Sequence, residues 1–229
     1  MATPIRIISS MATKALLADL VARYPAAADV DVDLVSVGGV DAARRVEAGD
    51  PMDIVVLAAN VIDKLIGSGQ VVAGSRADIV KSGVAIAVRA GQPGVDIGSE
   101  ASVKAAILAA RTIGYSTGPS GVYLAKLFER WGIAAEIKDR IVLAPPGVPV
   151  GALMAKGEVD LGFQQLSELM PIEGITILGP MPPAIQLMTT FSGGIAASSS
   201  QPDAARALLD YMLSADTAGI KHDNGMEPA

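Results

Sequence analysis

The stretch "IGYSTGPSGVYLAKLFERWG", residues 113–132, contains the junction that decides the fold. A short apolar run ends in small and hydroxyl residues, and an amphipathic helix pattern follows at once. The residues at the junction are Ser116, Thr117, Gly118, Ser120 and Gly121. A helix start has free N–H groups and partial positive charge, so small residues there let an anion approach. The alternative is that Thr117 or Ser120 only caps the helix.

Strand-like apolar runs alternate with helical patterns along most of the chain. We expect strands at 5–9, 30–37, 53–58, 82–90, 112–116, 140–144 and 159–165. We expect helices at 11–24, 40–48, 59–68, 99–110, 148–156 and 202–214, and a further helix directly after the strand at 112–116. The alternation predicts an α/β fold with mostly parallel sheets and helices on both faces.

Extended segments near 80–84 and 183–195 interrupt this alternation and predict two domains. Domain one is expected to be discontinuous, with residues 1–82 plus 190–229, and domain two is the insertion 83–189. We expect a ligand cleft between the two domains, which would close by a hinge motion.

Small-residue junctions between strand and helix recur three more times. They place Ser9 and Ser10 in "ISSMATKALLADL", Gly38 and Gly39 in "SVGGVDAARRVEAG", and Gly147 and Pro149 in "APPGVPVGALMAKG". Ligands of open α/β sheets bind beyond the carboxyl ends of the strands, where such loops gather. The four junctions therefore predict a site for a small anion that needs no Lys or Arg.

Four segments carry a resemblance to a known family. They are "SSMATKALLADL", "RRVEAGDPMDIVVLAANVIDKL", "GPSGVYLAKLFERWGI" and "GALMAKGEVDLGF". With them the chain resembles the type II periplasmic-binding-protein family, in particular the molybdate-binding proteins of ABC transporters. The resemblance implies a two-domain fold, a bound oxyanion and a transporter membrane component as a possible partner.

The resemblance also implies which residues bind the ligand. The family uses two serines, backbone amides at two helix starts and a late tyrosine. Ser10 matches the first serine, and Ser120 matches one helix start. Gly38 and Gly39 stand where the second serine is expected, Pro149 has no N–H, and Gln164 and Gln165 replace the tyrosine.

These departures favour an organic carboxylate over a tetrahedral oxyanion, because they leave a larger or differently shaped pocket. The expected ligand-binding residues are Ser9, Ser10, Gly38, Gly39, Thr117, Ser120, Gly121, Pro149, Gln164 and Gln165. A branch that resembles the family includes aconitate isomerase, which shifts a double bond in a tricarboxylic acid. A cofactor-independent isomerase of an unsaturated polycarboxylate is therefore the alternative to a binding protein.

An isomerase needs a proton donor and acceptor, and the sequence does not assign the catalytic residue. Glu168 and Glu173 follow the strand at 159–165, and we expect them to be solvated carboxylates, with Glu168 as the alternative base. His222, the single histidine, is expected on the surface. One of Tyr115 and Tyr123 is expected to face the ligand while the other packs.

Composition excludes several classes of protein. The 229 residues include no cysteine and one histidine, so we expect no disulfide, no transition-metal site and no cofactor. The net charge is −6 and basic residues are scattered, so we expect no nucleic-acid partner. No apolar run is long enough to span a membrane.

Two compartments remain open. The sequence as it stands has no secretory signal and would be cytoplasmic, whereas removal of a signal peptide would make the protein periplasmic. A solute receptor for an ABC transporter predicts the periplasm and no turnover. An isomerase predicts the cytoplasm and an ionisable group near the ligand, and a cytoplasmic sensor is a third, less favoured class.

Overall fold

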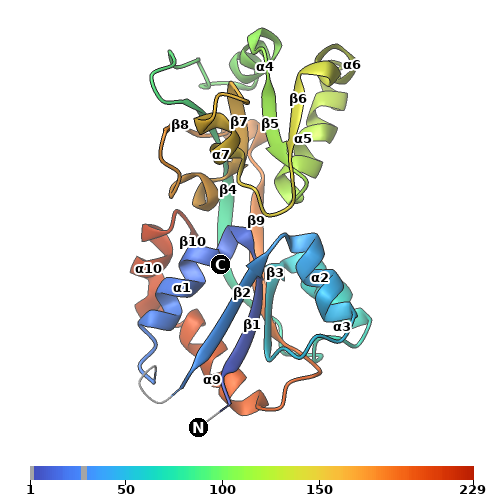
Figure 1. The fold of residues 1–229 in the computed structure, drawn as a ribbon, viewed down its shortest axis with the longest axis vertical. Coiled ribbons are helices and arrows are strands. Elements are labelled where there is room, and N and C mark those ends of the chain that lie inside the picture. Colours follow the sequence, from blue (N-terminus) through green and yellow to red (C-terminus); the bar gives the residue numbers. More distant parts are fainter. Residues whose placement is uncertain (1–2, 27–29) are drawn as a thin grey trace. The chain divides into compact units, whose positions relative to one another are not determined.

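The computed structural model describes residues 3–26 and 30–229, and the chain divides into two compact units. Unit 1 comprises Met1–Ser82 and Thr189–Ala229, and unit 2 comprises Gly83–Met188. Figure 1 shows the helices and strands of both units. Strands β4 (Ala77–Arg89) and β9 (Met188–Ile195) contain the boundaries, so the chain passes between the units as extended strands.

Unit 1 is built around a parallel group of three strands. Its remaining elements are β1 (Ile5–Ser10), η1 (Met11–Thr13), α1 (Lys14–Ala22), β2 (Val32–Val37), α2 (Gly39–Glu47), β3 (Ile54–Ala58), α3 (Ala59–Gly67), α9 (Pro202–Leu213), η4 (Ala215–Thr217), α10 (Ala218–Asp223) and β10 (Glu227–Pro228). The strand order is β2-β1-β3-β9-β4. β1 is parallel to β2 and β3, β9 is antiparallel to β3, and β10 is antiparallel to β4.

Unit 2 repeats this plan with its own parallel group. Its elements are α4 (Glu100–Ala109), β5 (Ile113–Ser116), α5 (Pro119–Arg130), α6 (Ala134–Ile137), η2 (Lys138–Arg140), β6 (Ile141–Ala144), α7 (Val150–Ala155), β7 (Leu161–Gln165), α8 (Leu166–Leu169), β8 (Ile175–Pro180) and η3 (Pro183–Ile185). The order is β4-β7-β5-β6. β5 is parallel to β6 and β7, while β4 is antiparallel to β7 and β8.

Helices cover both faces of each sheet because successive strand residues point to opposite sides. In unit 1, Ile7 packs with α1 and α9, whereas the next residue, Ile8, packs with α2 and α3. In unit 2, Ile86 packs with α4 and α5, whereas Ala87 packs with α7. The α/β class with helices on both faces, predicted from the sequence, is confirmed.

Two glycines on neighbouring strands allow α7 to lie close to the sheet of unit 2. Gly114 of β5 lies opposite Gly162 of β7, and a Cβ at either position would come within 3.0–3.1 Å of Val150 at the start of α7. Because neither strand has a side chain there, α7 packs directly over the strands. This packing places the start of α7 beside the end of β7.

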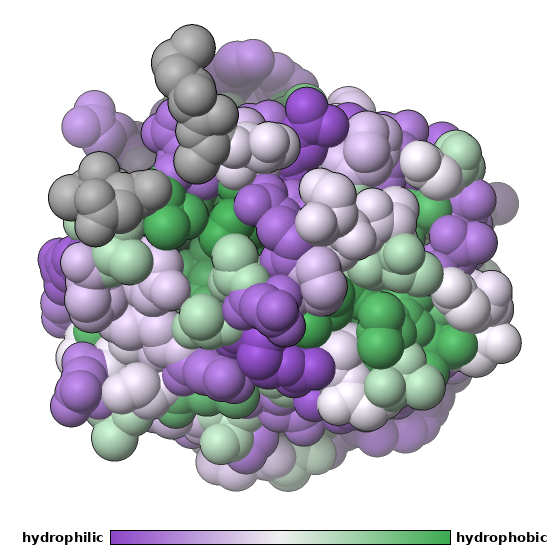
Figure 2. All heavy atoms as spheres, turned by 90° about the horizontal axis from the view of Figure 1, so that it is seen from below, coloured by the Kyte–Doolittle hydropathy of each residue, from purple (hydrophilic) through white to green (hydrophobic). Residues whose placement is uncertain are grey.

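One face of the molecule is shown in Figure 2, where hydrophobic residues form small patches separated by hydrophilic ones. Single exposed apolar residues are normal on a protein surface. Within residues 3–26 and 30–229, no helix is long and apolar enough to cross a membrane.

Candidate functional site

Ser10, the last residue of β1, is the polar residue that most clearly lacks a partner. Only 8% of the residue is exposed, and its Oγ is the one buried side-chain N or O atom of the described residues that has no hydrogen-bond partner. Buried polar atoms are almost always paired, and a hydroxyl can both donate and accept. The Ser10 hydroxyl is therefore available to a ligand.

The start of α2 lies next to this hydroxyl. Gly38 is the N-cap of α2 and supplies no side-chain cap, and Gly39 is its first helical residue. A Cβ at Gly39 would lie 3.8 Å from the Ser10 Cβ. The first-turn N–H groups of a nine-residue helix and an unpaired hydroxyl are thus neighbours within unit 1, an arrangement that suits a negative group.

Ser9 is differently placed from Ser10. It is fully buried, its Oγ lies 2.8 Å from the Ser36 Oγ of β2, and it also donates to the Ser10 carbonyl at 3.2 Å. The bond to Ser36 joins the ends of β1 and β2. The Ser9 hydroxyl therefore supports the strand ends, and no local sequence pattern distinguishes it from Ser10.

In unit 2, the start of α5 lies at the end of β5. The N-cap is Gly118, without a side-chain cap, so neither Thr117 nor Ser120 has the capping role considered from the sequence. Thr117 is exposed and Ser120 is buried. A Cβ at Gly121 would lie 1.6 Å from the Ser116 carbonyl oxygen, so the glycine lets α5 pack directly against the end of β5.

Gln164 of β7 is bonded to the start of α7. The Val150 N–H donates to Gln164 Oε1 at 2.7 Å, and Pro149 precedes it as the N-cap. Pro149 has no N–H, so it can offer a ligand no backbone hydrogen bond. Gln165 is also buried and is the N-cap residue of the short helix α8.

The surroundings of Glu168 in α8 differ from what the sequence predicts. It was expected to be a solvated carboxylate, but it is only partly exposed, and burial raises its pKa from the usual 4.5 to about 7. A hydrogen bond from the Gln164 side chain lowers the pKa but does not offset the burial. The expectation failed because the packing of α8 against α7 and β7 is not visible in the local sequence.

The other ionisable candidates are less suited to proton transfer. His222 and Glu173 are exposed. Tyr115 is buried against Phe128, with ring centroids 5.9 Å apart.

Tyr123, the other tyrosine considered from the sequence, already has a partner. Its hydroxyl donates to the Ile185 carbonyl at 2.9 Å.

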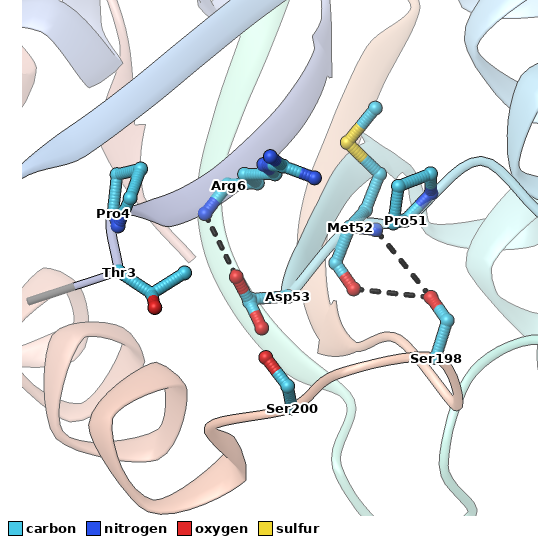
Figure 3. Close-up of a pocket in the computed structure, with 8 residues that line it drawn as sticks. All are labelled: Thr3, Pro4, Arg6, Pro51, Met52, Asp53, Ser198 and Ser200. Carbon is cyan, nitrogen blue, oxygen red and sulfur yellow. Dashed lines mark hydrogen bonds between the residues drawn. The ribbon is translucent and has the colours of Figure 1, made fainter.

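A small cavity of about 90 Å³ lies in unit 1, lined by Thr3, Pro4, Arg6, Pro51, Met52, Asp53, Ser198 and Ser200 (Figure 3). Burial opposes ionisation of Asp53, but hydrogen bonds from the Arg6 N–H, the Ser199 hydroxyl and Gln201 keep its pKa below the usual value. The cavity is smaller than typical ligand pockets, and its carboxylate is already bonded. It is therefore a structural feature of the amino ends of β1 and β3.

Metal-binding clusters are not found in the part of the chain that the structure describes. No group of three or more His, Cys, Asp or Glu side chains there could hold a metal ion.

Comparison with known proteins places the chain in a family. Residues 5–227 match the family described as bacterial extracellular solute-binding protein. The chain belongs to this family. The resemblance to the type II periplasmic-binding proteins that was seen in the sequence is confirmed.

Among curated proteins, a protein from Pseudomonas sp. described as aconitate isomerase is 38% identical over 234 residues. The match covers 99% of this chain and 88% of that protein.

Two solved structures share the fold at low sequence identity. The periplasmic molybdate-binding protein of Azotobacter vinelandii has a TM-score of 0.81 at 19% identity, with 98% of this chain and 99% of that chain covered. The sulfate-binding protein of Mycobacterium tuberculosis H37Rv has a TM-score of 0.78 at 17% identity, with 100% and 88% covered. These similarities establish the fold of the family in this chain.

Proposed function

We propose that the protein binds a small organic polycarboxylate, whose carboxylate groups accept hydrogen bonds from donors at the strand ends. The observation that carries the proposal is the buried Ser10 hydroxyl without a partner, beside the glycine-lined start of α2. The structural relatives named above are a molybdate-binding and a sulfate-binding protein, which supports an anion. The 38% identical relative described as aconitate isomerase supports a polycarboxylate in particular.

Thermal unfolding with added ligands tests the proposal, because a ligand that binds only the folded state raises the melting temperature. The panel is cis-aconitate, trans-aconitate, citrate, molybdate, tungstate and sulfate. We expect a carboxylate to raise the melting temperature. A rise with molybdate, tungstate or sulfate alone would contradict the proposal.

Ser10→Ala then tests whether the unpartnered Ser10 hydroxyl binds the ligand. We expect the affinity for the carboxylate to fall about tenfold, because a hydrogen bond to a charged group is lost. Without ligand the variant should be at least as stable as the native protein, since the hydroxyl has no partner. The control is Ser68→Ala, which changes an exposed serine after α3. An equal loss of carboxylate affinity in the two variants would contradict the assignment of Ser10 to the binding site.

A second candidate function is isomerisation of the bound ligand by a shift of its double bond. Two observations favour it: the near full-length match to a protein described as aconitate isomerase, and the ionisable Glu168 in unit 2. The test is NMR of the alkene protons of each carboxylate that binds. A ligand that binds without change would leave the protein a carboxylate receptor, with an ABC transporter membrane component as its partner.

A further inference from the structure

We propose that Asn224 is a site of spontaneous deamidation, and that its conversion to an acid releases α10 and β10 from α1. The stretch 218–228, which contains α10 and β10, is called the α10–β10 segment below. The segment and α1 both belong to unit 1. No ligand takes part in this chemistry, which is therefore separate from the proposed binding of a carboxylate.

The sequence around Asn224 favours the reaction. The chain has two asparagines, and Asn224 is the one followed by glycine, which has no side chain to hinder attack by its amide nitrogen. The Gly225 nitrogen attacks the Asn224 side-chain carbon Cγ and closes a succinimide ring. The bond from Cγ to Nδ2 breaks, and ammonia leaves with the proton that Gly225 gave up. Water then opens the ring at either carbonyl and leaves aspartate or isoaspartate at position 224, without oxidation or reduction.

The end of α10 requires the glycine of this reactive pair. Asn224 is the C-cap of α10, and Gly225 follows it with a φ of 69°, which glycine adopts without strain. The Met226 N–H donates to the Lys221 carbonyl at 3.0 Å. The Gly225 N–H donates to the His222 carbonyl at 2.9 Å. These two bonds form a Schellman motif, so the pair is a consequence of how the helix ends.

The Asn224 side chain links α10 to α1. Its Nδ2 donates to Asp19 Oδ2 of α1 at 2.9 Å and to the Ile220 carbonyl at 3.0 Å. After deamidation an oxygen replaces this nitrogen, so the donor is lost and a second carboxylate faces Asp19. Like charges disfavour each other, and the contact that holds the segment becomes repulsive.

The α10–β10 segment is short, and one of its own residues opposes docking. α10 has six residues and β10 has two, of which Pro228 has no N–H to donate. Ile220 and Met226 favour docking because they are buried in the core of unit 1. Lys221 opposes it, because it is buried and forms no ion pair within the part of the chain that the structure describes. Weakly held segments of this kind open without global unfolding.

Opening of the segment controls the rate of deamidation. While it is docked, the Gly225 N–H is bonded to His222 and Asn224 Nδ2 is held by two acceptors, so attack has to wait for opening. When opening and closing are fast, the rate follows the fraction of molecules that are open. Deamidation therefore reports how firmly α10 is docked on α1.

Mass spectrometry of the full chain tests the reaction. The protein is incubated at mildly alkaline pH, and trypsin then releases Asn224 in the peptide 222–229 and Asn60 in the peptide 46–64. We expect an acid at position 224, partly as isoaspartate, and an unchanged Asn60, which precedes a valine. The protein unfolded in guanidinium chloride should react at least about tenfold faster, because docking protects the site. If the unfolded protein converts while the folded protein forms no acid at position 224, the proposal is overturned.

Asp19→Ala tests the contact between the helices. The variant should deamidate at least about threefold faster than the native protein, because the bond from Asn224 is lost and the segment opens more often. The matched control is Asp33→Ala, which removes an exposed carboxyl from β2 of the same unit and should react at the native rate. Equal rates for Asp19→Ala and the native protein would contradict docking through Asp19.

Exchanging the two partners tests the effect of the acid. Asn224→Asp, which imitates the product, should lower the melting temperature and speed hydrogen exchange of the Met226 N–H, which closes the end of α10. Combining it with Asp19→Asn restores one donor and one acceptor and should recover most of both losses. If Asn224→Asp behaves as the native protein, or if the exchanged pair recovers nothing, the acid does not release the segment.

Discussion

The helix starts in the two units look alike in sequence but differ in how closely they pack. In unit 1, Gly39 has open space, because a Cβ there would make only an ordinary contact with Ser10. In unit 2, Gly121 has no open space beside it, because a Cβ there would lie 1.6 Å from the Ser116 carbonyl oxygen. Gly39 therefore leaves room beside Ser10, whereas Gly121 is required for the packing of α5 against β5.

The units differ as well in their buried ionisable groups. Unit 2 contains Glu168, whose pKa is raised by burial, and unit 1 contains Lys221, which is 2% exposed and whose pKa is lowered by burial. Among the described residues, none forms an ion pair with Lys221. In both cases the charged form is disfavoured in the folded state, so each group makes stability depend on pH.

The largest effect is expected from alanine at the two glycines. Gly121→Ala should lower the free energy of unfolding by about 3 kcal/mol or more, because the backbone of β5 or α5 must move. Gly39→Ala should leave the free energy of unfolding nearly unchanged and weaken ligand binding. Urea unfolding of both variants measures the two free energies of unfolding. Equal values would contradict the conclusion that the helix starts differ in how closely they pack.

An intermediate effect is expected from Glu168→Gln on stability. The folded-state pKa of Glu168 is raised, so its contribution is fully present below about pH 4.5 and is lost as the pH rises through about 7. The variant should match the native protein at pH 4 and exceed its unfolding free energy by up to about 3 kcal/mol at pH 8. Chemical unfolding at both pH values measures the difference, which Glu173→Gln should not reproduce.

The smallest effect is expected from Lys221→Met in unit 1. Removing a buried ammonium should raise the free energy of unfolding at pH 7 by about 1 kcal/mol. Because the folded-state pKa of Lys221 is lowered, the native protein should recover this difference as the pH rises toward 10.5. Lys156→Met, at an exposed lysine, is the control for melting curves, and a gain of the same size there would contradict the burial argument.

Much of the fold could be predicted because it depends on local periodicity. The alternation of strand and helix patterns gave the α/β class, and helix lengths came close, as with 202–214 against Pro202–Leu213. Boundaries set by distant contacts were less accurate. The strand expected at 82–90 is β4, Ala77–Arg89, since its first half pairs with β10 from the far end of the chain.

The candidate site was only partly predictable. The sequence could name Ser10, Gly39 and the start of α5 as candidates because small residues at a strand–helix junction form a local pattern. It could not separate Ser10 from Ser9, because the partner of Ser9 is Ser36, 27 residues away. It described Gln164 as a residue with both donors and acceptors for a ligand, and it could not show that the Gln164 oxygen accepts a hydrogen bond from the Val150 N–H, 14 residues away.

The sequence by itself determined the class of fold and the family, because residue types and their spacing encode these. Only the tertiary structure decided which hydroxyl is unpaired, which glycine is sterically required and which carboxyl has a pKa near 7. These properties depend on hydrogen bonding, close contact and loss of water. All three are created by segments that meet only in the folded protein.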